Sequence, residues 1–155
     1  MNTELIQKYI ICSLANEFIA MPINIVKEII DLDNYVISKI PGAVSSVIGV
    51  INLRGQIIPL LDSRQKLDFG LDVVFSKNPK AIIIEKEKEI FGLLVDEVHQ
   101  VAEILERNVE ISLDQPISKD VKIGTIFGKD INEKEKPVFI LSEEKLFNSN
   151  NSLVN

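Results

Sequence analysis

Few side chains in this sequence could serve as a nucleophile, a general base or a metal ligand. The chain has a single histidine, His99, and a single cysteine, Cys12. One histidine cannot build a multi-histidine metal site, and one cysteine cannot form an internal disulfide. A cysteine–histidine nucleophilic pair would need the two to meet, but Cys12 lies in an apolar run typical of a buried thiol and His99 is expected at the surface. The sequence therefore gives no support to catalysis by either residue.

Adjacent carboxylates and glycine-rich loops are other common signs of chemistry, and both are weak here. Asp96 and Glu97 are neighbours, so on one strand their side chains would point to opposite faces. We interpret Asp96 as a strand end whose carboxylate bonds the following amides. Gly42, Gly49 and Gly55 are separated by apolar residues and lack the lysine of a phosphate loop. The sequence thus predicts a protein without catalytic activity, bound metal or cofactor.

Two opposite charges stand out because each interrupts an apolar run. Arg54 lies within GVINLRGQIIPLLDSRQKL at residues 49–67, and Glu28 lies within VKEII at residues 26–30. A guanidinium that points into an apolar environment must be paired, since burying it alone is very costly. We therefore predict a charge pair between Arg54 and Glu28. The alternative is an ordinary solvent-exposed arginine in a turn.

The segment around Arg54 has the pattern of a strand, a turn and a second strand. Its aliphatic and β-branched residues favour strands, and Gly55 can take the positive φ of a tight reversal. Pro59 has no amide hydrogen for a ladder, which predicts an edge strand or a bulge. Asp62 and Ser63 then end the second strand and can cap a short helix over residues 64–67.

The chain contains two halves with similar hydrophobic patterns. In each half a predicted β-hairpin is followed by two aliphatic residues at a short helical or extended spacing, then by a glycine-punctuated strand pair and a short helix. The first half has these elements at residues 8–14, 18–23, Val26 and Ile29, and 49–67; the second has them at 80–84, 90–95 (charged hairpin tip 85–89), Val98 and Val101, 123–128, 138–141 and 145–147. This pattern indicates a duplication, and chance similarity among short apolar runs is the alternative.

Halves of this size cannot leave sheet edges open, and small closed or nearly closed barrels solve that problem. We therefore predict a mainly β fold of two small barrels, at about residues 8–76 and 79–147, with exchange of end strands allowed. The barrels would be joined around residues 70–79 and form one domain over residues 1–155. Residues 148–155 are expected to be a loose tail.

The composition limits the possible partners. A net charge of −6 and a pI near 4.9 argue against a nucleic-acid partner, which needs a concentrated basic face. The N-terminal MNTELIQK has no basic region followed by an apolar stretch, and no run is long enough to span a membrane. We therefore expect a cytoplasmic protein that neither binds nucleic acid nor inserts into a membrane.

The order of several short motifs resembles the CheW family of chemotaxis coupling proteins. The resemblance covers about residues 8–147, and its most specific parts are the NLRG block with the strand after it and GLLVDEV. The motifs are FIAMPI at 18–23, VKEI at 26–29, IP at 40–41, GVINLRG at 49–55, IPL at 58–60, DSR at 62–64 and GLLVDEV at 92–98.

The resemblance implies two SH3-like, five-stranded barrels related by internal pseudo-symmetry, with short helices. It also implies a non-catalytic scaffold that binds the cytoplasmic tip of methyl-accepting chemoreceptors and the regulatory domain of the histidine kinase CheA, and that is recruited to membrane receptor arrays. Arg54 and Glu28 match the family's paired arginine and glutamate near the receptor-binding surface. The protein-binding residues expected from the resemblance are Glu28, Asn52, Leu53, Arg54, Gly55 and Ile58.

The second half departs from the family pattern. Leu141 is followed by Ser142 where the family's aliphatic run usually ends in Asp, and a charged stretch at residues 128–137, which includes Lys129, precedes it. The outer loop of the second barrel is therefore the least transferable part. One alternative is the related CheV, which adds a receiver domain for which this sequence offers no aspartate pocket. Others are a coupling protein of a parallel pathway such as twitching motility, and a β-barrel ligand-binding enzyme subunit, which would need a polar pocket.

Overall fold

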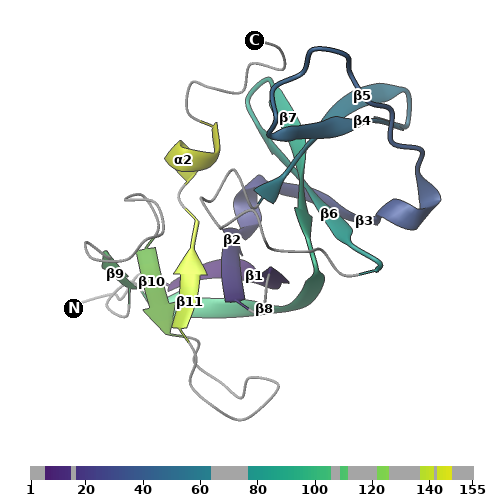
Figure 1. The fold of residues 1–155 in the computed structure, drawn as a ribbon. Coiled ribbons are helices and arrows are strands. Elements are labelled where there is room, and N and C mark those ends of the chain that lie inside the picture. The colour runs from purple at the N-terminus through teal and green to yellow at the C-terminus, as the bar shows by residue number, and fades with distance from the viewer. Residues whose placement is uncertain are drawn as a thin grey trace.

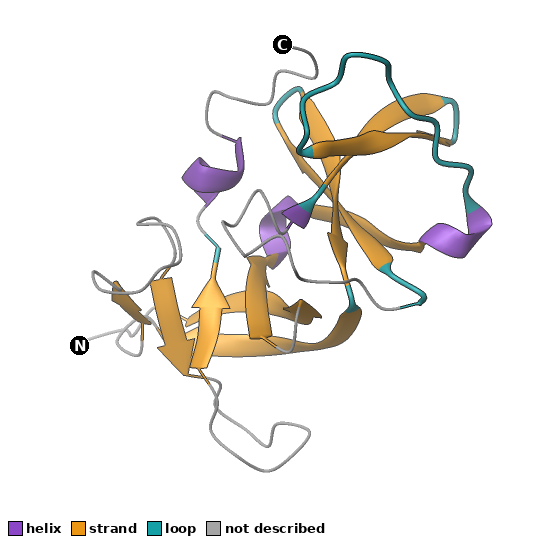
Figure 2. Cartoon of the chain, viewed as in Figure 1, coloured by secondary structure: helices purple, strands orange, loops and turns teal. Residues whose placement is uncertain are grey.

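The computed structural model describes residues 6–14, 17–63, 77–105, 109–111, 122–125, 137–141 and 143–147. Within them the fold is mainly β, as predicted, with only short helices (Figure 2). The strands are β1 (Ile6–Leu14), β2 (Glu17–Pro22), β3 (Val26–Asp31), β4 (Val47–Leu53), β5 (Gln56–Leu61), β6 (Lys80–Lys86), β7 (Glu89–Val95), β8 (Glu97–Leu105), β9 (Val109–Ile111), β10 (Lys122–Thr125) and β11 (Pro137–Ile140). The helices are the 3-10 turns η1 (Ile23–Ile25) and η2 (Leu32–Asn34) and the α-helix α2 (Glu143–Phe147).

The strands form two sheets that lie beside each other (Figure 1). The first sheet has the order β8-β1-β2-β11-β10-β9, and the second has the order β3-β6-β7-β5-β4. The second sheet has the five strands that the family resemblance implies. The first has a sixth, the three-residue strand β9, which pairs with β10.

Each predicted half contributes one hairpin to the other sheet. The hairpin β1–β2 pairs with strands of the C-terminal half, antiparallel with β8 and parallel with β11. The hairpin β6–β7 pairs with strands of the N-terminal half, antiparallel with β3 and parallel with β5. The two sheets therefore exchange whole hairpins, so neither sheet coincides with one of the barrels predicted at residues 8–76 and 79–147. Apart from β9, the two orders still correspond strand by strand, which is the pattern that a duplication produces.

The predicted local elements have counterparts in the structure, with changed limits. The spacing of Val26 and Ile29 is extended, in β3. The β6–β7 hairpin reverses at residues 87–88, so its turn is shorter than the charged tip predicted at 85–89. β5 ends before Asp62, as predicted, while the predicted helix at 64–67 and the tail at 148–155 lie outside the described residues. No helix in the described part of the chain has the length and apolar character needed to cross a membrane.

Pro59 lies in an inner strand, so of the two predicted placements, an edge strand or a bulge, the edge strand is wrong. The register shift between β4 and β5 lies between Val47 and Gly49, opposite Leu61 and Leu60 and next to Pro59. β5 is flanked by β4 and β7, and Pro59 stands opposite Val50. The amide and the carbonyl of Val50 both bond Ser38, which makes Val50 and Pro59 a non-hydrogen-bonded pair. On the other side, pairing with β7 begins only at Leu60. The proline is tolerated because it loses no bond to β4 and precedes the part of β5 that pairs with β7.

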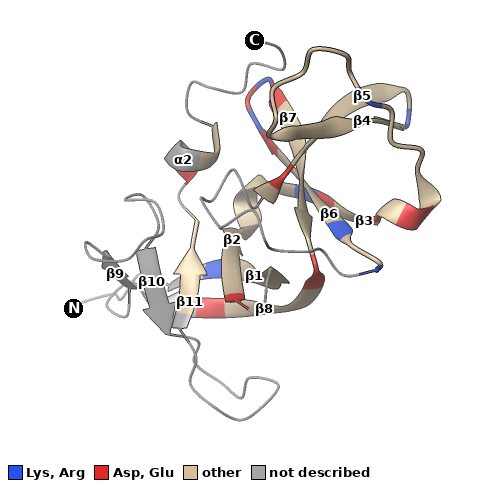
Figure 3. Cartoon of the chain, in the orientation of Figure 1, with Lys and Arg blue, Asp and Glu red and all other residues tan. Residues whose placement is uncertain are grey.

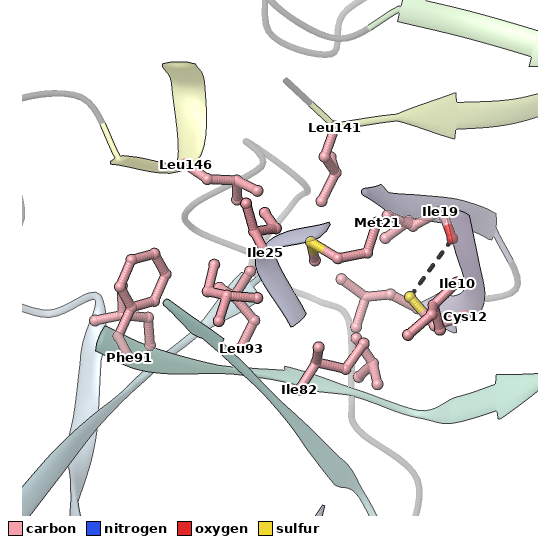
Figure 4. Close-up of a cluster of buried hydrophobic side chains, with 14 of the residues drawn as sticks. Ile10, Cys12, Ile19, Met21, Ile25, Ile82, Phe91, Leu93, Leu141 and Leu146 are labelled. Atoms are coloured by element: carbon pink, nitrogen blue, oxygen red, sulfur yellow. Dashed lines mark hydrogen bonds between the residues drawn. The ribbon is translucent and has the colours of Figure 1, made fainter. Parts of the chain in front are cut away.

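Among the described residues, buried apolar side chains form three clusters, one within each sheet and one between them. The cluster between the sheets, called the junction cluster below, takes residues from both sheets and is drawn in Figure 4. It consists of Ile10, Cys12, Leu14, Ile19, Met21, Ile25, Leu61, Ile82, Ile84, Phe91, Leu93, Val95, Phe139, Leu141 and Leu146. Along β6, Ile82 belongs to this cluster and its neighbour Ile83 to the core of the second sheet. Strands buried on both faces explain why the sequence has continuous apolar runs instead of strict alternation.

Candidate functional site

The candidate site is built on the two-residue turn that joins β4 to β5. Leu53 pairs with Gln56, and the two residues between them both have positive φ, 51° at Arg54 and 85° at Gly55. Positive φ at both central positions defines a type I′ turn, whose twist matches that of the flanking strands. The side-chain oxygen of Asn52 accepts a hydrogen bond from the Gly55 amide at 2.8 Å. The NLRG sequence therefore encodes the turn itself, and it also holds Arg54 at the tip.

Arg54 and Glu28 form the predicted charge pair. The Nη1 atom of Arg54 lies 2.6 Å from Oε1 of Glu28 and donates a hydrogen bond to it. The hydrogen bond and the charge of Glu28 raise the pKa of Arg54 above its ordinary value. The Arg54 side chain is nonetheless 73% exposed and that of Glu28 21%. The alternative of a solvent-exposed turn arginine is therefore also correct, and burial does not force this pair.

The pair connects the two outer strands of the second sheet. Glu28 lies on β3, at one end of the strand order, while Arg54 follows β4 at the other end. A contact between the two ends of a sheet is what closure into a barrel requires. Leu53 and Ile58, which the resemblance adds to the site, are buried in the core of the second sheet. They support the turn from inside, and the surface of the site is formed by Glu28, Asn52, Arg54 and Gly55.

Sequence reasoning missed an exposed apolar residue beside the turn. Ile57 pairs with Asn52 across the β4–β5 hairpin and is 60% exposed. The signal was present, since Ile57 and Ile58 are adjacent on one strand and only one of them can face the barrel core. Val36 and Ile37, in the loop that bridges to β4 at Ser38, are also exposed. The charged turn therefore has aliphatic neighbours that a protein partner could cover.

The residues considered for catalysis lie elsewhere and do not form a nucleophilic pair. Cys12 is fully buried in the junction cluster, its thiol donates to the Ile19 carbonyl at 3.5 Å, and burial raises its pKa to about 12 (Figure 4). His99 is partly buried instead of fully at the surface, and it is the extra residue of a bulge where β8 pairs with β1. Its Nε2 lies 3.0 Å from Ser13 Oγ, and its ring contacts Phe18 edge-on. A thiol that is this hard to ionise is a poor nucleophile.

The structure also locates Asp96 and the surrounding charges. Asp96 lies between β7 and β8, as predicted for a strand end, and its amide donates to the Ser13 carbonyl at 2.9 Å. Across the described ranges, no three or more His, Cys, Asp or Glu side chains gather as a metal site would require. Figure 3 shows Lys and Arg interspersed with Asp and Glu along the described strands and turns of the second sheet.

A pocket of about 370 Å³ lies where β6 and β8 begin, a feature that the sequence does not indicate. It is lined by Lys77, Asn78, Lys80, Asp96, Glu97 and Val98. Small-molecule sites are mostly apolar with a few placed polar groups, whereas this lining is mainly charged. Lys80 is moreover held by Asp31, with Nζ 3.0 Å from Oδ2. The pocket therefore gives little support to a ligand-binding subunit.

Comparison with known proteins identifies the family. The model of the CheW-like domain matches residues 8–151. The chain belongs to the CheW-like family. It is 30% identical to scaffolding protein TtCheW from Thermoanaerobacter tengcongensis, whose crystal structure superposes with a TM-score of 0.74 over 94% of this chain and 95% of that one. This likeness confirms the fold expected from the resemblance.

Two relatives named chemotaxis protein CheW match over a shorter length. The protein from Bacillus subtilis is 30% identical over 87 residues, which is 56% of this chain and 54% of that protein. The protein from Klebsiella aerogenes is 32% identical over 95 residues, which is 61% of this chain and 55% of that protein. The chain thus spans about half the length of these relatives in the matched region.

Proposed function

We propose that this chain is a non-catalytic chemotaxis scaffold that couples methyl-accepting chemoreceptors to the histidine kinase CheA. The observation that carries the proposal is the Arg54–Glu28 pair on its NLRG turn, in a chain matched by the CheW-like model over residues 8–151. The names of the two relatives support the chemotaxis setting, and the name of TtCheW supports the scaffold role.

The turn places an arginine where the backbone alone would favour another residue. Type I′ turns prefer Asn, Asp or Gly at their central positions, because an L-residue with a side chain loses about 1 kcal/mol or more in the left-handed region. Arg54 occupies such a position with φ of 51°. Backbone strain of this kind is common at functional sites. Glu87, with φ of 57° in the β6–β7 turn, shares it, so at Arg54 the argument rests on the strain together with the pairing to Glu28. Glu28 accepts a hydrogen bond from one of the five N–H groups of the Arg54 guanidinium. The other N–H groups can donate hydrogen bonds to a partner protein.

The boundary between the sheets offers partly exposed aliphatic side chains. Val26 on β3 and Val98 on β8 pack against the junction cluster but remain partly exposed, and we call these two residues the junction rim. Val26 belongs to the second sheet, two residues before Glu28, whereas Val98 belongs to the first. A receptor tip is a long helical hairpin, and one apolar face of a helix docks on such a rim while Arg54 binds an acidic or carbonyl group beside it.

The test compares binding by wild type and variants to a receptor cytoplasmic fragment and to the kinase regulatory domain, using calorimetry. Arg54→Asn keeps a residue suited to the turn and removes the guanidinium. The matched control is Lys27→Gln, which breaks the neighbouring Lys27–Glu85 pair of 3.2 Å on the same strand as Glu28. We expect Arg54→Asn to weaken receptor binding at least about tenfold, or about 1.4 kcal/mol, and Lys27→Gln to change it little.

Four results would contradict parts of the proposal. Unchanged receptor affinity in folded Arg54→Asn would remove Arg54 from the site. A large loss for Lys129→Ala, in the charged stretch outside the described residues, would move the site to that loop. Wild-type binding only to receptors and kinases of another pathway, such as twitching motility, would reassign the coupling role. A phosphoryl group transferred from ATP to the purified chain, and lost on mutation of one residue, would overturn the non-catalytic reading.

A further inference from the structure

The helix α2 links the first sheet to the second. It follows β11 of the first sheet after two residues (Figure 1), and its described side chains pack against the junction cluster and Phe91 of the second sheet. Leu146 is fully buried in the junction cluster, and the ring of Phe147 meets Phe91 of β7 edge-on, with centroids 5.3 Å apart. A helix of five residues does not form alone in water, so these contacts hold α2 in place.

Glu143, the first residue of α2, uses both carboxylate oxygens to hold two other elements. Its Oε1 accepts a hydrogen bond from the Asn24 side chain at 2.6 Å, and its Oε2 lies 3.3 Å from Nζ of Lys86. Asn24 lies in η1, which is the crossover from β2 in the first sheet to β3 in the second. Lys86 lies at the end of β6 beside the hairpin turn. One carboxylate thus joins α2, the crossover and a hairpin of the second sheet.

We propose that Glu143 is a positioning residue that fixes the angle between the two sheets and, through it, the spacing of the junction rim. Asn24 precedes Val26 by two residues, so the hydrogen bond between Asn24 and Glu143 fixes the position of Val26, one of the two residues of the junction rim. Val98, the other side, belongs to the first sheet, from which α2 itself emerges through β11. The inference about receptor binding rests on the proposed function; the inference about the sheet angle does not.

The energetics favour a positioning role over a purely stabilising one. Apolar burial on α2 comes from Leu146 and Phe147, whereas the Glu143 and Lys86 side chains are partly exposed. Partly exposed ion pairs contribute little to unfolding free energy. Removing Glu143 is therefore expected to lower the melting temperature much less than removing the buried Leu146 would, while the sheets sample a wider range of angles.

The experiment measures the sheet angle and receptor binding separately. Spin labels are attached to Gln56→Cys, on β5 of the second sheet, and to Gln100→Cys, on β8 of the first, and the distance between them is measured by pulsed EPR. Both positions are exposed, whereas Cys12 is buried and stays unlabelled. The test variants are Glu143→Ala and Asn24→Ala. The control is Glu85→Ala, because the Lys27–Glu85 pair has similar exposure but joins β3 to β6 within the second sheet.

We expect both test variants to broaden or shift the distance distribution, and the control to leave it unchanged. If about one tenth of the molecules keep the binding geometry, receptor-fragment affinity falls about tenfold. An unchanged distribution in folded Glu143→Ala and Asn24→Ala would overturn the proposal. A broadened distribution with unchanged receptor affinity would overturn its link to the rim. A broadened distribution in a protein whose wild type binds no receptor fragment would uphold the positioning role and refute the proposed function instead.

Discussion

Adjacent isoleucines on β6 test whether the two sheets share one core. Ile82 faces the junction cluster and Ile83 faces the core of the second sheet, and both are 0% exposed. Ile57, on β5, is 60% exposed and provides a control of the same residue type. The change is Ile→Val at each position, which removes one methylene and keeps a β-branched side chain suited to a strand.

The expected cost follows from burial. Removing a methylene from a fully buried isoleucine destabilises a protein by about 0.5–1.5 kcal/mol, through lost transfer free energy and a small cavity. A change of about 1 kcal/mol lowers the melting temperature of a domain of this size by about 2–4 °C. We expect Ile82→Val and Ile83→Val each to show this loss. Ile57→Val should stay within about 0.5 kcal/mol of wild type because its side chain already contacts water.

Urea and thermal unfolding followed by circular dichroism measure these differences. Because the junction cluster takes side chains from both sheets, we also expect one cooperative transition in every variant. If Ile82→Val unfolded like Ile57→Val while Ile83→Val was destabilised, the junction face of β6 would be solvated and the two sheets would be independent. Two separate transitions in wild type would refute the shared core in the same way.

Three further outcomes are expected. Gly49→Ala should lower the free energy of unfolding in urea by about 1–3 kcal/mol, because an added Cβ would lie 2.6 Å from the Ser38 carbonyl oxygen. An unchanged free energy of unfolding would contradict this close approach. The hydrogen bond from Lys80 lowers the pKa of Asp31 below 3.8, so the ionised Asp31 stabilises the fold above about pH 4, and this stabilisation is lost as the pH falls through the lowered pKa. Asp31→Asn should therefore make the free energy of unfolding depend less on pH in this range. The same dependence on acid pH in wild type and Asp31→Asn would refute the prediction. Cys12 should react with thiol reagents only after unfolding, and labelling of the folded protein at pH 8–9 would contradict its burial.

The sequence predicted the strands more reliably than their partners. Local signals suffice for a hairpin, since a run such as residues 80–84, a polar turn and a second run pair with each other. No local signal says which strand lies beside a hairpin on its outer side. β1 and β6 are both apolar on their two faces, so hydrophobic pattern alone does not distinguish pairing with β8 from pairing with β3. The exchange of hairpins between the sheets is therefore a property of the whole chain.

In the candidate site, too, the local sequence predicts the turn, whereas the contact between Arg54 and Glu28 depends on how distant strands are arranged. The glycine of NLRG predicted a turn, and a two-residue loop between paired strands implies positive φ at both positions, including Arg54. The pairing with Glu28 was predicted from the cost of burying a charge, yet Arg54 is largely exposed, so that reason does not account for the pair. What accounts for it is closure of the second sheet, which brings β3 next to the β4–β5 turn. An arginine held by a glutamate from the opposite edge, on a backbone suited to asparagine or glycine, is difficult to explain by stability alone. That mismatch is the strongest reason to look for a partner of Arg54 outside the chain.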